Sequence, residues 1–308
     1  MKIFNDFENV GFIRNAVVTT GSFDGVHRGH KLILQRLKKL AFETGGETVL
    51  ITFYPHPRKV LYPDTIGKDL LLLNSQQEKI ELLQKAGLDN LIIVNFTLEF
   101  SKVTSVDFVK NILLNKIHAR KIVIGKNHHF GHNREGDSEK MHQLGLEYGF
   151  DVEEIPEQEI EDESISSGKI REALQAGDIE KANTYLDHPY IMMGELMDPY
   201  QAIMALDPDV YTIKIDEQSK LIPKDGIYAV AVSDDEHLVR AVCFVRKDPR
   251  FINPPLNFFL IDKPSDFGKN SVTVLFQKFL REEDTSKDLE DFEARLKSDK
   301  SLVKHMIF

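Results

Sequence analysis

The chain has 308 residues, of which 42% are hydrophobic and 29% are charged, and its formal net charge is −10. This length suits two domains with cores of their own, and no apolar run approaches the roughly 20 residues of a membrane-spanning helix. The acidic balance argues against a broad nucleic-acid-binding surface, and the single cysteine, Cys243, excludes an internal disulfide and a multi-cysteine metal site. We therefore expect a cytoplasmic protein with small-molecule partners, since the acidic first ten residues do not suggest export.

The first predicted element is a buried strand at 16–18, rich in β-branched residues. A turn with three glycines follows: Gly21, Gly25 and Gly29. Leucine and isoleucine then recur at helical spacing, so a helix begins near His30. A strand, a glycine-rich loop and a helix in this order bring backbone N–H groups and the positive end of a helix to one anion. His27 and His30 stand at this helix start, where their rings could donate hydrogen bonds to phosphate oxygens.

Strand and helix patterns alternate along the rest of the first half. Apolar, β-branched runs predict strands at 47–53, 91–96, 121–124 and 151–155. Helical spacing predicts helices at 74–86, capped by Asn74, at 107–114, after Ser167 and at 179–186. This alternation predicts an α/β fold with a doubly wound parallel sheet.

Two polar loops come directly after predicted strands, where α/β folds place their ligands. The loop after 47–53 contains Pro55, His56 and Pro57. A packing role is expected for the His56 ring and a binding role for the loop backbone, with the two weighted about evenly. The loop after 121–124 holds three histidines in five residues. Two of them are adjacent and no cysteine supports them, so their spacing does not suit a zinc site.

The end of the first half predicts a second phosphate contact. An acidic run at 157–163 is expected to be a solvated loop, and Ser166 and Ser167 then suit a helix cap. Lys169 and Arg171 add positive charge beside the free N–H groups of that helix start. The alternative is a capped structural helix with surface bases.

Beyond His188 the pattern becomes β-rich. Short strands are predicted at 210–215, 227–232, 238–245, 257–261 and 272–280, separated by Pro, Gly and Asp, with a helix at 289–296. Such a series is typical of a small β-barrel closed by a helix.

Several strings resemble one family. G-S-F-D-G-V-H-R-G-H (21–30) contains the H-x-G-H of HIGH-type nucleotidyltransferases, and with T-F-Y-P-H-P-R-K-V-L (52–61) and I-S-S-G-K-I-R (165–171) it is similar to prokaryotic FAD synthetases. L-I-P-K-D-G-I-Y-A-V (221–230) resembles the riboflavin kinase barrel of that family. The resemblance implies an FMN adenylyltransferase domain of the HIGH type at 1–186 and a riboflavin-kinase-like β-barrel with a C-terminal helix at 187–308. It also implies transfer of AMP from ATP to FMN, with Mg²⁺, to give FAD and pyrophosphate.

The resemblance assigns roles to individual residues. The catalytic candidates are His27, His30 and Arg171. The ATP-binding candidates are Gly21, Ser22, Phe23, Asp24, Gly25, His27, His30, Ser166, Ser167 and Arg171. The FMN-binding candidates are Pro55, His56, Pro57, Asn127, Phe130 and Arg134. Asn127 and His128 depart from the Asp and Phe that the family has in this loop, and no metal ligand is assigned.

The kinase half departs from the family at three features of its chemistry. No glycine and no P-T-A-N occur between Met197 and Ile215, where the nearest equivalent is Asp209 to Thr212. Asn257 stands where the family has a glutamate base, and an amide cannot accept a proton at neutral pH as a carboxylate does. These departures predict a catalytically degenerate kinase module. Two alternatives stay open: a bifunctional enzyme with a rebuilt kinase site, and a non-catalytic flavin-nucleotide binder or regulator.

Overall fold

The computed structural model describes residues 1–126, 128–156, 159–160, 163–198, 209–234, 236–246, 255–268, 271–282 and 289–306. The chain divides into two compact units. The first consists of Met1–Leu70 and Lys79–Ile165, and the second of Leu71–Glu78 and Ser166–Phe308. These units differ from the two predicted domains, 1–186 and 187–308. Residues 71–78 and 166–186 pack with the second unit, although the predicted boundary places them in the first domain. The domain assignment by function stays a prediction.

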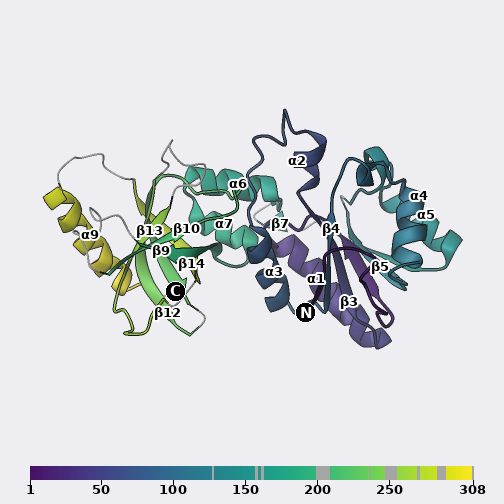
Figure 1. Ribbon diagram of the computed structural model, residues 1–308, viewed down its shortest axis with the longest axis horizontal. Helices are drawn as coiled ribbons and strands as arrows, with labels where there is room; N and C mark the ends of the chain where they lie inside the picture. The colour runs from purple at the N-terminus through teal and green to yellow at the C-terminus, as the bar shows by residue number, and fades with distance from the viewer. Residues whose placement is uncertain are drawn as a thin grey trace. The chain divides into compact units, whose positions relative to one another are not determined.

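A six-stranded parallel sheet forms the centre of the first unit (Figure 1). Its strands are β1 (Lys2–Phe4), β2 (Val17–Thr20), β3 (Thr48–Tyr54), β4 (Asn90–Asn95), β5 (Lys121–Gly125) and β6 (Asp151–Ile155), in the order β1-β4-β3-β2-β5-β6. All of its pairings are parallel, which confirms the doubly wound sheet. The strand order reverses between β2 and β5, and ligands bind at such a switch point, beyond the carboxyl ends of the strands.

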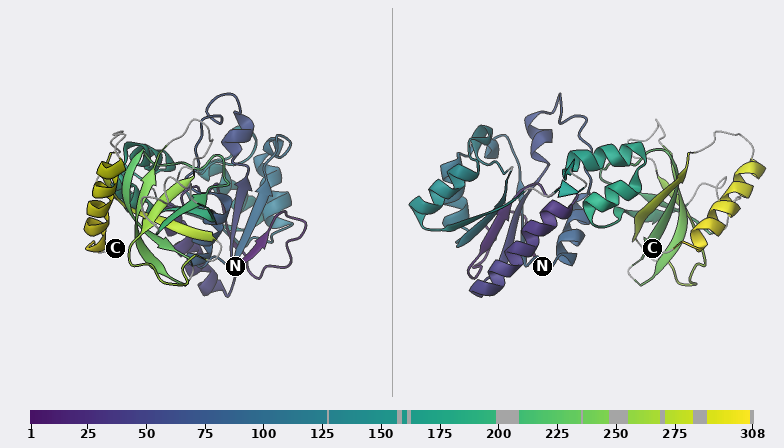
Figure 2. Two further views of the ribbon diagram at one scale, coloured as in Figure 1. Left: turned by 60° about the vertical axis from the view of Figure 1, so that its left-hand side comes forward. Right: turned by 180° about the vertical axis from the view of Figure 1, so that it is seen from behind.

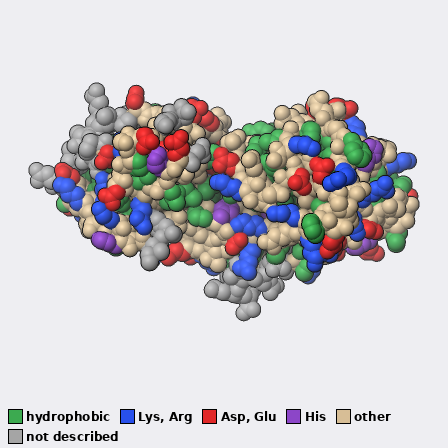
Figure 3. All heavy atoms as spheres, turned by 90° about the horizontal axis from the view of Figure 1, so that it is seen from below, with side chains coloured by type: hydrophobic (Ala, Val, Ile, Leu, Met, Phe, Trp, Pro, Cys, Tyr) green, Lys and Arg blue, Asp and Glu red, His purple; other side chains and the backbone are tan. Residues whose placement is uncertain are grey.

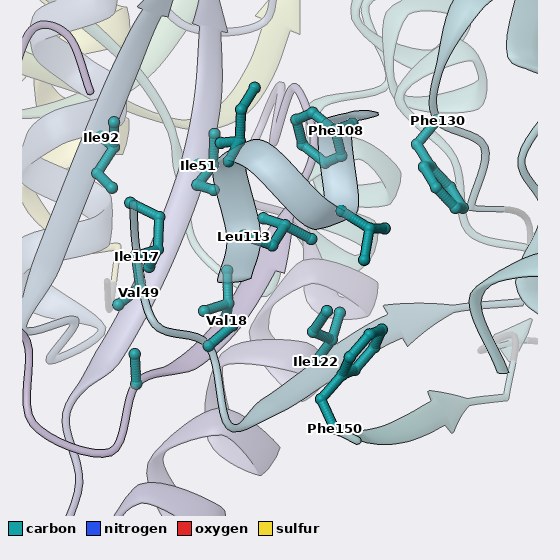
Figure 4. Close-up of a cluster of buried hydrophobic side chains, with 14 of the residues drawn as sticks. Val18, Val49, Ile51, Ile92, Phe108, Leu113, Ile117, Ile122, Phe130 and Phe150 are labelled. Atoms are coloured by element: carbon teal, nitrogen blue, oxygen red, sulfur yellow. The ribbon is translucent and has the colours of Figure 1, made fainter. Parts of the chain in front are cut away.

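Helices cover both faces of this sheet, because successive side chains of a buried parallel strand point to opposite faces. Val17, Leu50 and Leu91 pack on one face with the leucines of α1 (Arg28–Thr44) and α3 (Gln76–Lys85). Val18 and Ile51 point to the other face, where they meet side chains such as Phe108 and Leu113 (Figure 4). That face is covered by α4 (Ser105–Asp107), the π-helical η2 (Phe108–Leu114) and α5 (Ser138–Tyr148).

Several local predictions differ from the structure. Ser75 and not Asn74 caps α3: its Oγ accepts from Glu78 N at 3.2 Å, and the Glu78 carboxylate accepts from Ser75 N at 2.8 Å. This reciprocal arrangement is a capping box, whose Ser-x-x-Glu signature is present in the sequence. The acidic run contains a short hairpin of β7 (Glu159–Ile160) and β8 (Glu163–Ser164) where a loop was predicted; 157–158 and 161–162 lie outside the described residues. The sequence also did not predict β1, α2 (Pro57–Leu61), η1 (Phe100–Lys102), η3 (His132–Arg134) or α5.

The second unit contains a closed six-stranded antiparallel barrel, as predicted. Its strands are β9 (Tyr190–Met197), β10 (Val210–Lys214), β11 (Gly226–Ser233), β12 (Leu238–Val245), β13 (Leu256–Leu260) and β14 (Ser271–Arg281), closed in the order β10-β13-β12-β11-β14-β9. Helices α6 (Ser167–Ala176) and α7 (Ile179–Leu186) precede it, and α9 (Leu289–Lys304) lies beside it (Figure 2). Phe292 of α9 packs edge-on against Phe244, and Arg281 of β14 forms an ion pair with Asp299.

Within the described ranges, no helix combines the length and the apolar character needed to cross a bilayer. On the face drawn in Figure 3, the described basic and acidic side chains are interspersed and are not separated by sign.

Candidate active site

The glycine-rich turn between β2 and α1 has an unusual backbone. Phe23, Gly25 and Val26 have φ values of 47°, 90° and 41°. Glycine tolerates a positive φ, but for a β-branched residue such as Val26 it is a strained conformation. Phe23 and Val26 are 2% and 1% exposed and belong to the core. The packing of these two side chains therefore stabilises the strained backbone conformation. Strained backbone concentrates at ligand sites, because only there does it serve a purpose beyond folding.

Two histidine rings lie at the end of this turn. His27 and His30 stack with their centroids 3.7 Å apart, and Phe23 stacks on the other side of His30 at 4.4 Å. His27 is the N-cap residue of α1, but its side chain forms no capping hydrogen bond, and the first turn contains no acidic residue. The first turn of α1 thus adds no negative charge to the positive end of the helix, which favours an anion here.

His30 is held neutral. Burial lowers the pKa of His30 well below its ordinary value, and the neighbouring His27 and Lys79 lower it further. The Nδ1 atom of His30 is buried and has no hydrogen-bond partner among the described residues. A buried polar atom without a partner is rare in folded proteins and fits a site that awaits a polar ligand.

Lys79 is a residue of this site that the sequence did not reveal. It lies on α3, is only 6% exposed and is close enough to His30 to lower the pKa of that ring. In the sequence it is one polar residue of an amphipathic helix, with no signal that separates it from the lysines of a solvated face.

A hydrogen bond joins the last residue of β2 to the loop that follows β5. Thr20 Oγ1 lies 3.3 Å from His128 Nε2, and the His128 ring stacks on Phe130 at 5.8 Å. Burial, with a smaller contribution from His129, lowers the pKa of His128 to about 4. The ring is thus neutral at pH 7 and packs as the phenylalanine expected at this position would. This contact ties together the two strands of the switch point.

The loop after β5 is shaped by close backbone approach. Phe130 and Gly136 exchange two backbone hydrogen bonds of 2.9 Å, and a Cβ atom at Gly136 would lie 2.7 Å from the Phe130 ring. Phe130 is 7% exposed and belongs to the core, whereas Arg134 is exposed. Asn127 lies outside the described residues, so the flavin roles of Asn127, Phe130 and Arg134 stay predictions. Three further half-buried aromatic residues, Phe53, Phe96 and Phe100, continue this row of rings from the ends of β3 and β4.

The loop after β3 has a structural use for its histidine. The Tyr54–Pro55 peptide is cis, and Pro57 begins α2. His56 Nδ1 accepts a hydrogen bond from Arg58 N at 3.2 Å and so caps α2. The capping role accounts for the ring of His56, and the binding role of Pro55, His56 and Pro57 remains a prediction.

The second predicted phosphate group belongs to the second unit, whereas the turn at 21–30 belongs to the first. Ser166 caps α6 by accepting from Lys169 N at 3.4 Å, and Ser167 begins the helix. Arg171 Nε donates to the carbonyl oxygen of Leu71 at 2.5 Å. The capped helix start is therefore as the sequence predicted, and its side-chain roles toward a nucleotide stay predictions.

In the kinase-like barrel, two residues at positions that depart from the family's kinase motifs lie opposite each other. Thr212 of β10 lies opposite Asn257 of β13, and the Thr212 hydroxyl donates to the Asn257 amide oxygen at 2.8 Å. Thr212 is fully buried. Of the region from Met197 to Ile215, which corresponds to the family's flap and P-T-A-N, residues 199–208 lie outside the described residues.

Among the residues that the structure describes, no three His, Cys, Asp or Glu side chains are grouped to hold a metal ion. Mg²⁺ keeps several waters and binds through phosphates with one or two carboxylates. A MgATP substrate therefore needs no such group, and buried Asp24 in the turn is the nearest carboxylate along the chain to His27.

Comparison with known proteins decides the family. The model of the FAD synthetase family matches residues 11–169, and that of riboflavin kinase matches residues 186–307. The chain belongs to the FAD synthetase family. Its curated relatives include proteins named bifunctional riboflavin kinase/FMN adenylyltransferase from Listeria monocytogenes (30% identical, 92% of this chain and 90% of the relative) and Pseudomonas fluorescens (28%, 93% and 91%). The relative from Escherichia coli K12 carries the same name and is 26% identical over 97% of this chain and 96% of its own length.

A solved structure titled as a macrolide-efflux protein from Streptococcus pneumoniae has the same fold. It superposes with a TM-score of 0.84 over 99% of each chain, at 23% identity. At this identity the likeness concerns the fold alone.

Proposed function

We propose that this member of the FAD synthetase family transfers AMP from MgATP to FMN, giving FAD and pyrophosphate. The observation that supports this most directly is the strained turn that brings two stacked histidines to the start of α1. It lies at the switch point of a parallel sheet, where nucleotides bind. The single cysteine, buried Cys243, suits a reducing cytoplasm as the place of this reaction.

The reaction needs positioning and charge stabilisation and no protein nucleophile. A phosphate oxygen of FMN attacks the α-phosphorus of ATP, the bond from that phosphorus to the bridging oxygen breaks, and pyrophosphate leaves. His27 and the neutral His30 would each donate one N–H to phosphate oxygens, and Lys79 would add positive potential beside them. The turn from Gly21 to Gly25, with Ser22, Phe23 and buried Asp24, would hold the triphosphate against the start of α1.

Ser167 and Arg171 would bind the ATP phosphates as well, with Ser166 as the cap that orders their helix. The flavin would lie along the loops after β3 and β5. Pro55, His56 and Pro57 would border its ring, Phe130 would support the loop from the core, and Asn127 and Arg134 would supply polar groups.

A second activity, phosphorylation of riboflavin, is favoured by the family match over 186–307. The Thr212–Asn257 hydrogen bond argues against it, because the residue at the base position is an amide whose oxygen is already engaged. We therefore propose that the barrel folds as a riboflavin kinase module without phosphorylating riboflavin at a useful rate.

One assay tests these proposals. The purified chain is given either FMN or riboflavin with ATP and Mg²⁺, and the products are separated by chromatography. We expect FAD from FMN, and neither FMN nor FAD from riboflavin. Absence of FAD from FMN would favour the non-catalytic binder, and FMN from riboflavin would favour the bifunctional enzyme.

A further inference from the structure

A fully buried lysine in the second unit has no place in the proposed chemistry. Lys220 lies in the connection between β10 and β11, and its side chain is 0% exposed. Its amine donates to the carbonyl oxygens of Leu73 and Ile191, both at 2.7 Å, and to a Glu78 carboxylate oxygen at 2.6 Å. All three of its N–H groups are used, and the amine lies 4.3 Å above the Tyr190 ring. A buried charge with its hydrogen bonds satisfied holds its partners in one geometry.

Two of the three partners of Lys220, Leu73 and Glu78, lie on a segment that is more than 140 positions away in the sequence. Glu78 also accepts from Met193 N of β9 at 2.9 Å and from Ser75 N at 2.8 Å. Leu72 N donates to Ser219 O at 2.6 Å, and Leu221 N donates to Leu72 O at 2.8 Å. The segment Leu71–Glu78 is therefore fixed to the barrel by main-chain hydrogen bonds and by one buried ion pair.

The same segment holds Arg171. The carbonyl oxygen of Leu71 accepts from Arg171 Nε at 2.5 Å, and Leu71 is adjacent to Leu72, which pairs with the residues around Lys220. A hydrogen bond at Nε fixes the plane and direction of a guanidinium group, which bound phosphate recognises geometrically. A chain of contacts thus runs from Lys220 through 71–73 to Arg171, entirely within the second unit.

We propose that Lys220 is a positioning residue for adenylyl transfer: by holding segment 71–78 on the barrel it holds the Leu71 carbonyl that aims Arg171 at the ATP phosphates. This inference rests on the proposed role of Arg171. It gives the barrel a use that does not depend on its own catalysis, since the barrel contributes the lysine that orders an ATP-binding residue.

The test compares Lys220→Met with the parent in FAD formation, with each substrate varied in turn. We expect the apparent KM for ATP to rise about tenfold, as for loss of one well-placed charge-assisted contact, while the KM for FMN and the kcat stay within a few-fold. Lys224→Met is the matched control, because Lys224 lies in the same connection and its ion pair with Glu282 is exposed. The control should keep the parent values.

A second variant separates positioning from folding. Lys220→Met alone leaves Glu78 as a buried charge without its counterion, which threatens folding. The pair Glu78→Leu with Lys220→Met removes both charges, so we expect its thermal unfolding to return toward the parent while its KM for ATP stays raised. A paired variant with the parent KM would overturn the inference and leave Lys220 a structural residue.

Arg171→Ala separates the proposed role of Arg171 from that of Lys220. A parent-like KM for ATP in Arg171→Ala would overturn the proposed role of Arg171 itself. A raised KM in Arg171→Ala together with a parent-like KM in both Lys220 variants would overturn only the inference about Lys220.

Discussion

His30 is the side chain whose surroundings are hardest to explain by packing alone. Its ring lies between Phe23 and His27, and its Nδ1 is buried without a partner among the described residues. If it donates to a phosphate in the transition state, His30→Ala should lower kcat for FAD formation by about 10²–10³, the usual loss for one such donor. His142→Ala, an exposed histidine of α5, is the control. A folded His30→Ala variant with activity within a few-fold of the parent would contradict the assignment.

His128 makes the fold sensitive to acid. Its ordinary pKa is 6.5 and burial lowers it to about 4, so between these values the unfolded chain binds a proton that the folded ring does not. The free energy of unfolding therefore falls as the pH falls through this window, and His30, whose pKa is also lowered, acts in the same direction. From pH 7 to pH 5 we expect His128 to account for about 2 kcal/mol of this loss.

His128→Phe should remove that part of the pH dependence, because phenylalanine does not titrate. Urea unfolding at pH 7 and pH 5 measures it, with His129→Phe, a change at an exposed neighbouring position, as the control. The same loss of stability in His128→Phe as in the parent would show that this ring is not responsible.

Single residues were predictable where the chemistry is local in the chain. The strained turn and its two histidines occupy ten consecutive positions, so their spacing alone indicated an anion site. Lys79 could not be found in this way, because its approach to His30 depends on how α3 packs on the sheet. The capping role of His56 was not predicted for a related reason, since α2 has only five residues and no periodicity that would indicate a helix.

At the scale of elements, the loop after β5 can be tested through one glycine. A Cβ atom at Gly136 would lie 2.7 Å from the Phe130 ring, and that ring is buried in the core. Gly136→Ala should therefore displace Phe130 and destabilise the fold by about 1–3 kcal/mol. If Phe130 borders the flavin, the KM for FMN should rise more than the KM for ATP.

Gly11→Ala is the matched control for this substitution, because a Cβ atom there meets nothing within 4 Å. Thermal unfolding and the two KM values are measured for both variants. Gly136→Ala with parent stability and parent KM for FMN would show that the loop yields easily and that Phe130 does not shape the flavin site.

Most strands were predicted from their apolar, β-branched runs, whereas β1, β9 and α5 were not. The central strands and the barrel strands β10 to β14 follow their β-branched runs to within about two residues at each end. The three-residue β1 is too short to show a pattern. Strand β9 was not predicted because it begins at Tyr190, where a boundary between domains was expected. Helix α5 has two signals in the sequence, the Asp137 cap and the final glycine, Gly149. They were not used because Asp137 was interpreted as part of the preceding nucleotide loop.

At the scale of the whole molecule, the sequence separated an α/β half from a β-barrel half but did not show that segment 71–78 is fixed to the barrel. Leu73 and Lys220 are 147 positions apart, and neither carries a local signal for the other. From the sequence, a lysine in the connection between two barrel strands is expected to be exposed to solvent. Only the tertiary structure shows that Lys220 is enclosed. Non-local contacts of this kind explain why the compact units and the predicted modules begin at different residues.

The barrel gives the last prediction, that the chain does not phosphorylate riboflavin at a useful rate. Phosphoryl transfer needs a nucleotide flap, a metal-bound nucleotide and a residue that accepts the substrate proton, and these parts act together. Here the flap region lacks glycine, and Asn257 at the base position accepts a hydrogen bond from Thr212. Asn257→Glu should therefore leave riboflavin unphosphorylated, since it restores one part and also places a carboxylate beside a buried hydroxyl. Riboflavin with ATP and Mg²⁺ is followed by chromatography, while FAD formation from FMN in the same preparation shows that the protein is active. FMN formation by the unmodified chain would contradict the prediction. FMN formation by Asn257→Glu but not by the parent would show that the missing base alone accounts for the lost activity.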